Sequence, residues 1–279
     1  MATTSIITKA RRTTGLCEEK LENIYNMEKL KGKNAFVTGT SQGIGLAISR
    51  LLIEAGCNVA MHFFHSDEEI RKLQELAESK NQKAICVQGD LTNEQDAQRC
   101  VKEAVDYLDS FDVLVNNSGS IVARKKVGEI DLGYWKTLVD INLTTMMLVT
   151  RELVPHMNSE SGASIVNVSS LAGRTGGHAG SLVYSMCKGA MLTWTRSLAK
   201  ELAPQGIRVN VVAPGFIEGT NFHKIHTTRE SALKTIEGIP LGRSGNPDDV
   251  ARAVLFLASE YDGFITGATL DINGGVYSA

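Results

Sequence analysis

A tyrosine and a lysine four positions apart have the residue types of a proton-transfer pair. Tyr184 and Lys188 stand in the segment YSMCK, within a stretch of small and apolar residues. On a helix this spacing puts both side chains on one face, so the ammonium can approach the phenol. Since a nearby cation lowers a tyrosine pKa from its usual value of about 10, we expect Tyr184 to exchange protons near neutral pH. Taken alone, a lysine stem packed beside an amphipathic tyrosine is the commoner explanation of such a pair.

The elements that must position this pair alternate between strand and helix from Lys33 onward. Apolar residues recur at helical spacing in segments such as 44–55. Strands that are apolar on both faces and separated by helices indicate a parallel sheet with right-handed crossovers. We therefore predict an α/β fold, a doubly wound, Rossmann-like parallel sheet of about seven strands with helices on both faces. The expected strands are 34–39, 58–64, 83–90, 112–119, 164–170, 207–214 and 269–275.

The first expected strand leads into a glycine cluster, TGTSQGIG, at residues 38–45. Gly39 permits a tight exit from the strand, Gly43 lets the backbone approach a pyrophosphate, and Gly45 lets the next helix lie against the sheet. The N-terminus of that helix offers N–H groups and a partial positive charge to phosphates. By itself, an ordinary strand-to-helix turn also explains such a cluster. The spacing G-x-x-x-G-x-G differs from the more familiar G-x-G-x-x-G.

The glycine cluster resembles the TGxxxGIG motif of the short-chain dehydrogenase/reductase family, and further motifs of that family follow in order. NNSG stands where the family usually has NNAG, and YSMCK fits its Y-x-x-x-K motif. The resemblance runs from Lys31 to Gly275. The matching segments are 38–45, Asp90-Leu91, 116–119, DINLTT at 140–145, Ser169-Ser170, 184–188, Pro214-Gly215 and ITGATLDINGG at 265–275.

The resemblance implies catalytic roles for Ser170, Tyr184, Lys188 and Asn142. Ser170 would hold and polarise a substrate carbonyl, and Tyr184 would donate a proton to it. Lys188 would also bind the nicotinamide ribose, and Asn142 would bind a water that links Lys188 to solvent. Ser169 competes with Ser170, because strand residues alternate faces and only one of the two can point into the cleft. Ser170 is the nearer fit to the spacing in the family.

The resemblance also implies a nicotinamide cofactor, with NADP(H) favoured over NAD(H). An acidic residue at the end of the second strand would bind a ribose 2′-hydroxyl and repel a 2′-phosphate. The family's usual acidic position holds Phe63, and the strand ends in HFFHS without an acid. The expected cofactor-binding residues are Gly39, Ser41, Gln42, Gly43, Ile44, Gly45, Phe63, His65, Ser66, Asp90, Leu91, Asn116, Ser118, Gly119, Tyr184, Lys188, Pro214, Gly215, Ile217 and Thr220.

Composition argues against several other classes of protein. The 279 residues carry a formal net charge of -2, which gives no electrostatic footprint for nucleic acid or a membrane. No apolar run reaches the roughly 20 residues needed to cross a bilayer. The five cysteines include no C-x-x-C pair, so we expect free thiols and no metal site. His223 and His226 are interpreted as exposed histidines of a lid at 216–238 rather than metal ligands.

Residues 1–26 differ from the rest of the chain. Residues 1–17 are rich in threonine and contain three basic residues and no acidic one, and an acidic stretch follows. We interpret residues 1–26 as a poorly ordered extension. A short organellar targeting segment is the alternative. We expect a single dinucleotide-binding catalytic domain at 27–279 and a cytosolic protein.

These observations predict an NADP(H)-dependent reductase of a 3-oxoacyl group or a related ketone, most similar to the 3-oxoacyl-(acyl carrier protein) reductase type within the family. A sugar, polyol or other secondary-alcohol dehydrogenase is the alternative enzyme. A non-catalytic NADP(H)-binding sensor is the alternative of another class. The basic residues 124–126 either meet the phosphate of a carrier-linked acyl chain or are simply solvated. The resemblance further implies a homotetramer that acts on a small molecule.

Overall fold

A computed structural model describes residues 27–65, 68–158, 162–220, 228–259 and 263–278 of the chain. Within these ranges, parallel strands form one sheet in the order β3-β2-β1-β4-β5-β6-β7. The predicted doubly wound sheet is therefore confirmed. The strands are β1 (Asn34–Val37), β2 (Asn58–Phe63), β3 (Ala84–Gln88), β4 (Val113–Asn116), β5 (Ala163–Val168), β6 (Ile207–Pro214) and β7 (Thr269–Ile272).

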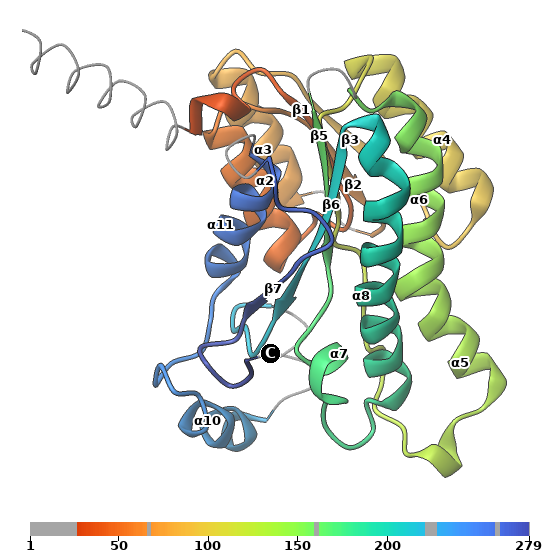
Figure 1. Ribbon diagram of the computed structural model, residues 1–279, viewed down its shortest axis with the longest axis vertical. Helices are drawn as coiled ribbons and strands as arrows, with labels where there is room; N and C mark the ends of the chain where they lie inside the picture. Colours follow the sequence, from red (N-terminus) through yellow and green to blue (C-terminus); the bar gives the residue numbers. More distant parts are fainter. Residues whose placement is uncertain (1–26, 66–67, 159–161, 221–227, 260–262, 279) are drawn as a thin grey trace, which may run out of the picture.

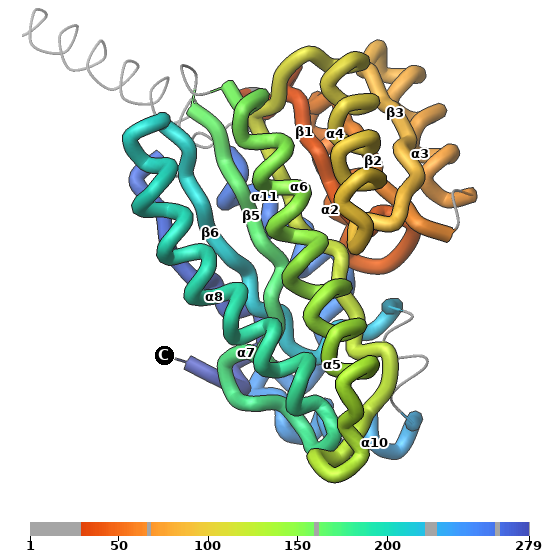
Figure 2. Tube along the Cα trace, turned by 90° about the vertical axis from the view of Figure 1, so that its right-hand side faces the viewer, coloured from red at the N-terminus to blue at the C-terminus, as the bar shows by residue number. Residues whose placement is uncertain are grey.

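Helices cover both faces of the sheet (Figures 1 and 2). One face carries α2 (Gly43–Glu54), α3 (Glu68–Ser79) and α11 (Pro247–Ala258). The opposite face carries α4 (Glu94–Leu108), α6 (Thr145–Leu153) and α8 (Leu182–Leu202). The shorter elements are α5 (Leu132–Val139), α7 (Ala172–Thr175), α10 (Arg229–Glu237), the 3₁₀ turns Met27–Leu30, Val127–Glu129, Val154–His156 and Ala203–Gln205, and a π turn at Asp140–Thr144.

The core forms two apolar layers, one on each side of the sheet. Alternate residues of one strand belong to opposite layers, because successive side chains of a strand point to opposite faces. In β1, Val37 packs with the layer under α2 and α11, whereas Phe36 packs with the layer under α4 and α6. In β4, Val115 and Leu114 divide in the same way. This two-sided burial explains why the strands read as continuous apolar runs.

Several strands end earlier than the sequence predicts. β1 ends at Val37 rather than 39, and β4 ends at Asn116 rather than 119. The hydroxyl of Thr38 accepts hydrogen bonds from the backbone N–H groups of Asn117 and Ser118, at 2.9 and 3.0 Å. These bonds replace the regular pairing of β1 with β4, so both strands end here. This is the point where the strand order reverses, between β1 and β4, and a crevice forms there in open α/β sheets.

The described thiols are free. Cys57, Cys100 and Cys187 are buried and Cys86 is half-buried, while Cys17 lies outside the described residues. In the same ranges, no helix combines the length and the apolar character needed to span a bilayer.

Candidate active site

The Tyr184–Lys188 pair lies at the carboxyl edge of the sheet, in the first turns of α8. Only 9% of Tyr184 and 3% of Lys188 are exposed. The Lys188 ammonium donates to the carbonyl oxygen of Val168, the last residue of β5, at 2.9 Å. Its nitrogen lies 5.8 Å from the centroid of the Tyr184 ring, over the ring face. The helix and the strand end thus hold the two groups side by side.

Burial shifts both groups away from their charged forms. Removal from water raises the pKa of Tyr184 to about 12, although a hydrogen bond from Ser170 and the charge of Arg124 oppose the shift. Burial also lowers the pKa of Lys188 to about 8. The expectation that Lys188 lowers the pKa of Tyr184 is therefore wrong for the protein alone, because desolvation dominates and the ammonium lies over the ring. At neutral pH, Tyr184 keeps its proton and is suited to donate it.

The two candidate serines point in different directions. Ser169 is buried and its hydroxyl donates to the carbonyl oxygen of Lys188 at 2.7 Å. Ser170 is half-buried, accepts from the backbone N–H of Ala172 at 3.1 Å, and is hydrogen-bonded to the phenol of Tyr184. Ser169 therefore ties the strand end to α8, and Ser170 is the serine beside the phenol.

Asn142 lies in the π turn between α5 and α6 and is fully buried. Its amide donates to the carbonyl oxygens of Ser120 and Leu138, at 2.8 and 2.9 Å, and its side-chain oxygen accepts from the N–H of Ser120 at 3.2 Å. A Cβ at Gly119 would lie 2.8 Å from that oxygen and 2.9 Å from the Lys188 ammonium. Asn142, Lys188 and the chain after β4 thus converge on one point. Isolated π turns of this kind are frequent at functional sites.

The glycine cluster forms the turn between β1 and α2. Gly39 and Gly43 have φ angles of 67° and 56°, a conformation that side chains other than glycine rarely adopt. A Cβ at Gly45 would clash with the carbonyl oxygen of Gly39. The first turn of α2 holds no acidic residue, and Gln42 at the N-cap makes no side-chain capping bond. This backbone cradle and open helix end fit the phosphates of a dinucleotide.

Asn117 supports this cradle, although sequence reasoning selected its neighbour Asn116. The Asn117 amide donates to the carbonyl oxygens of Thr38 and Gly39, both at 2.9 Å. The amide of Asn116 instead donates to Thr150 and Asn167 in a buried network between strand and helix. Any cofactor contact of Asn116 would therefore come from its backbone. The motif NNSG gives no signal about which asparagine faces the cleft.

His62 also supports the cradle and was not selected from the sequence. Its ring lies in β2 and is 3% exposed. Nδ1 accepts from the backbone N–H of Gly39 at 3.3 Å, and Nε2 donates to the carbonyl oxygen of Gly89 at 3.0 Å. Burial lowers its pKa to about 4, so the ring is neutral and can accept and donate at the same time. His62 therefore connects the glycine turn to the end of β3.

The end of β2 differs from the expected picture at one residue. Phe63 is 7% exposed and packs in the core under α2, so its side chain does not face a ribose. Phe64 is 48% exposed, and its ring lies against that of His65 with centroids 4.0 Å apart. His65 is exposed beyond the strand, whereas Ser66 lies outside the described residues.

The remaining predicted contacts line the same edge. The carboxylate of Asp90 accepts from the N–H and hydroxyl of Thr92, and the following Leu91 is buried. Gly215 follows β6 and donates to Ile272 at 2.9 Å. Thr220 lies against Gly43, where a Cβ would meet its methyl at 3.3 Å. The other predicted positions around the crevice are Ser41 and Ile44 beside the glycines, Ser118 after β4, Pro214 at the end of β6, and Ile217 on the way to Thr220.

The predicted lid lies only partly within the structure. Residues 221–227, which include His223 and His226, are outside the described residues. The remainder contains α10, whose N-cap Thr228 accepts from the backbone N–H of Ser231. The expectation that this segment closes over a cofactor stays a prediction.

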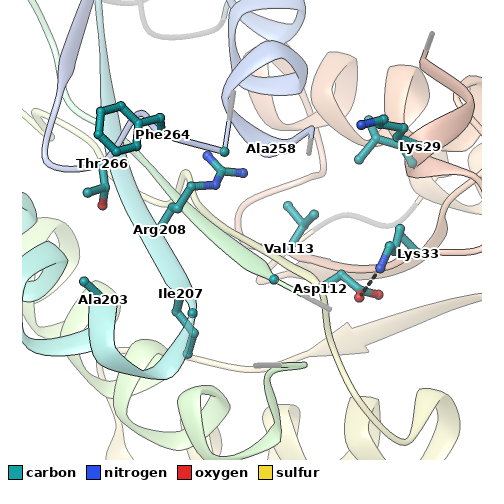
Figure 3. A pocket seen from close by; sticks show the side chains of 14 residues that line it. Lys29, Lys33, Asp112, Val113, Ala203, Ile207, Arg208, Ala258, Phe264 and Thr266 are labelled. Carbon is teal, nitrogen blue, oxygen red and sulfur yellow. Dashed lines mark hydrogen bonds and ion pairs between the residues drawn. The ribbon is translucent and has the colours of Figure 1, made fainter. Parts of the chain in front are cut away.

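Two cavities lie at opposite edges of the sheet. A groove of 650 Å³ beside the start of α8 is lined by Lys125, Lys126, His178, Leu182 and Met186, among others. A cavity of 620 Å³ lies at the amino edge, where the Lys33–Asp112 ion pair, Arg208 and Phe264 surround it (Figure 3). The catalytic candidates are all at the carboxyl edge, so the second cavity is separate from them.

Comparisons with known proteins give a family model and a relative that match most of the chain. A family model described as enoyl-(acyl carrier protein) reductase matches residues 39–277. The 3-oxoacyl-[acyl-carrier-protein] reductase FabG of Aquifex aeolicus (strain VF5) is 39% identical over 249 residues, covering 89% of this chain and 99% of the relative.

Two solved structures are similar over nearly their whole length. A blue fluorescent protein from a metagenomic library, in complex with NADPH, has a TM-score of 0.83 and 31% identity, covering 90% of this chain and 100% of that chain. The NADH-dependent reductase A1-R′ responsible for alginate metabolism has a TM-score of 0.82 and 28% identity, also covering 90% of this chain and 100% of that chain. Each match covers 90% of this chain and therefore extends over the α/β fold.

Proposed function

The chain belongs to the short-chain dehydrogenase/reductase family and is a nicotinamide-dependent oxidoreductase acting on C=O or CH–OH groups, and from this premise we propose that it is an NADP(H)-dependent reductase of a 3-oxoacyl group or a related ketone. The observation that carries the proposal is the buried phenol of Tyr184, which is hydrogen-bonded to Ser170 and has the Lys188 nitrogen 5.8 Å from the centroid of its ring. A phenol that keeps its proton at neutral pH is suited to reduction, in which the new alkoxide must be protonated.

The proposed mechanism assigns one task to each group. When bound, a reduced nicotinamide supplies hydride to the carbonyl carbon. Ser170 donates a hydrogen bond to the carbonyl oxygen, and Tyr184 gives its proton to that oxygen as negative charge develops there. With the hydride on the carbonyl carbon and the proton on the oxygen, the ketone becomes a secondary alcohol.

Lys188 and Asn142 would restore the proton. With a pKa of about 8, Lys188 exchanges protons more readily near neutral pH than an ordinary lysine. The Asn142 oxygen and the Lys188 ammonium both lie close to Gly119, so a water that links Lys188 to solvent would have to bind near this point. The ribose of the cofactor would be held by Lys188, and the pyrophosphate by the turn at Gly39–Gly45.

Preference for NADP(H) is the finer part of the proposal. The described end of β2 presents Phe64 and His65 and no carboxylate, so nothing there would repel a 2′-phosphate. One similar structure holds NADPH, which supports the preference, while another is titled an NADH-dependent reductase. We expect His65→Asp to lower kcat/KM for NADPH by at least ~10-fold relative to NADH, because a carboxylate opposes a phosphate.

A sugar or polyol substrate is the second candidate. The similarity to a reductase of alginate metabolism favours it specifically. A non-catalytic sensor would not need a buried phenol beside a serine and a lysine, which argues against that class.

The test is to mix the protein with NADPH or NADH and acetoacetyl thioesters, diketones and ketoses, and to follow the absorbance of the reduced cofactor. Fastest consumption with NADPH and acetoacetyl thioesters supports the proposal, whereas a preference for ketoses supports the second candidate. Cofactor binding without consumption on any carbonyl contradicts both and supports the sensor.

We also propose the family's homotetramer, a cytosolic location, and a single catalytic domain at 27–279 preceded by an extension. Exposed apolar side chains on α11 and β7, at Phe256 and Leu270, support burial against another copy. Light scattering on the purified chain would test the assembly, and a monomer would contradict it.

A further inference from the structure

Arg124 stands out among three consecutive basic residues in the loop between β4 and α5. Lys125 is engaged, since its ammonium pairs with Asp131 at 2.8 Å and lies 4.8 Å from the centroid of the Tyr134 ring. The Arg124 side chain is exposed, and no hydrogen bond or ion pair joins its guanidinium to any described residue. An exposed, unpaired arginine is ordinarily just solvated, so its surroundings decide whether it has a role.

The loop on both sides of Arg124 is held firmly. Val122 has a φ angle of 58°, which is a strained conformation for a β-branched residue. The N–H of Ala123 donates to the carbonyl oxygen of Ile121 at 2.6 Å, which closes a tight turn around Val122. The hydroxyl of Tyr134 then donates to the carbonyl oxygen of Ala123 at 2.7 Å. Strain of this kind persists where the surrounding structure fixes it, and it clusters at ligand sites.

The other side of Arg124 is fixed against the loop that precedes α8. The N–H of Lys125 donates to the carbonyl oxygen of Gly180 at 3.0 Å. A Cβ at Gly180 would lie only 3.0 Å from the Cβ of Arg124. Glycine at position 180 therefore allows the Arg124 side chain to pack against the backbone of this loop. The stem of Arg124 is therefore held between its own loop and the loop that leads into α8, the helix of Tyr184, and its charged end is exposed.

The charge of Arg124 reaches the catalytic phenol. Burial is the largest influence on the pKa of Tyr184 and raises it, while the charge of Arg124 lowers it. The adjoining groove carries Lys126 and His178 beside the apolar side chains of Leu182 and Met186. This groove therefore combines positive charge with apolar walls, which suits a molecule that has an anionic end and an apolar or neutral remainder.

We propose that Arg124 is a specificity-determining residue that binds an anionic oxygen group, a carboxylate or a phosphate, on the ketone that Tyr184 protonates. This inference rests on the proposed carbonyl-reductase function and adds the charge of its substrate. The planar guanidinium can form two parallel hydrogen bonds with either group, which a lysine cannot reproduce.

The experiment compares matched substrates that differ only in this charge. One pair is a 3-oxo acid and its methyl ester, and the other is acetoacetyl-4′-phosphopantetheine and acetoacetyl-pantetheine. Each is measured with the wild type, Arg124→Gln, Arg124→Lys and the control Lys136→Gln, which removes an exposed charge on α5 that does not line the groove.

In at least one pair, Arg124→Gln should lower kcat/KM for the charged member by at least ~10-fold, mainly through KM, and leave the neutral member within about twofold. Arg124→Lys should recover only part of the loss, and Lys136→Gln should have little effect. The pair that responds identifies the anion as carboxylate or phosphate. Equal losses on both members, or equal losses in Lys136→Gln, would overturn the proposal while leaving the reductase function intact. No cofactor consumption by the wild type on any carbonyl would instead overturn the proposed function, and this inference with it.

Discussion

Two lysines at opposite edges of the same sheet are treated differently by the fold. At the amino edge, Lys33 pairs with Asp112 at 3.0 Å, and that carboxylate also accepts from the N–H of Asn34 and the amide of Asn158 (Figure 3). At the carboxyl edge, Lys188 is more deeply buried but donates to a neutral carbonyl, and no carboxylate pairs with it in the described ranges. A compensated charge stabilises the fold, whereas an uncompensated one has a shifted pKa and costs stability.

This difference between Lys33 and Lys188 indicates which edge of the sheet carries the catalytic groups. Buried groups with perturbed pKa values gather at functional sites, because desolvation tunes them for proton transfer. Tyr184, Lys188 and His62 all lie at the carboxyl edge, and burial is the largest cause of each shift. The amino edge has a cavity of similar volume but a satisfied ion-pair network. We therefore expect substitutions at the two edges to separate activity from stability.

Lys188→Met should produce the largest effect on activity. Loss of the ammonium should lower kcat by at least ~100-fold, the usual scale for a group in proton transfer. The free energy of unfolding at pH 7 should not fall, since an uncompensated buried charge is replaced by an apolar side chain of similar length. Steady-state kinetics and urea unfolding on the same preparation check both statements. A large loss of stability would contradict the claim that the buried charge of Lys188 is uncompensated.

Asp112→Ala should produce the opposite result. It leaves Lys33 and the amide of Asn158 without this carboxylate, so the free energy of unfolding should fall by about 2–3 kcal/mol. The value of kcat should stay within about twofold of wild type. Asp106→Ala is the control, because Asp106 forms only an exposed pair with Lys102 and should change stability by less than about 0.5 kcal/mol. A similar loss in the two variants would contradict the assignment.

Gly119→Ala should have a smaller effect, confined to activity. The new methyl would meet Asn142 and Lys188 at 2.8 and 2.9 Å, so kcat should fall about tenfold as the two groups are displaced. Gly128→Ala is the matched control, since its Cβ meets nothing within 4 Å. If both variants keep the wild-type kcat, the space beside Gly119 is not part of the proton path.

The pH dependence of stability should report the burial of His62 in its neutral form. Its pKa falls from 6.5 in the unfolded chain to about 4 in the folded protein, so the unfolded state binds more protons between these values. The contribution of His62 is therefore present above pH 6.5 and lost as pH falls toward 4, by on the order of 1 kcal/mol per pH unit. Urea unfolding of wild type and His62→Gln at several pH values measures it. Parallel pH profiles would contradict the predicted shift.

The sequence predicted the fold and the location of the site but not its electrostatics. Two-sided apolar runs specify a parallel sheet, and β6 has the predicted bounds at Ile207–Pro214. The predicted ends of β1 and β4 lie too far along the chain. The two strands separate where the Thr38 hydroxyl accepts hydrogen bonds from residues 79 and 80 positions away, and a local sequence pattern does not reveal such distant contacts.

The pKa of Tyr184 was predicted in the wrong direction for a related reason. Helical spacing correctly brings Lys188 near the ring, but burial depends on every element that packs around α8. The same limit explains His62, since a histidine in a strand reveals neither its burial nor its two backbone partners. The sequence does not distinguish Asn117 from Asn116, because the two asparagines are adjacent. Only the turn after β4 directs Asn117 to the glycine turn and Asn116 to the buried network with Thr150 and Asn167.

The most direct test of the account is a single measurement on Tyr184→Phe. The variant loses one hydroxyl, and the exposed Tyr107→Phe serves as the control. Single-turnover transfer from bound NADPH to the best carbonyl should be slowed by at least ~100-fold, while the affinity for NADPH stays within about threefold. Transfer at a near-normal rate with NADPH bound would contradict the claim that the phenol of Tyr184 protonates the substrate.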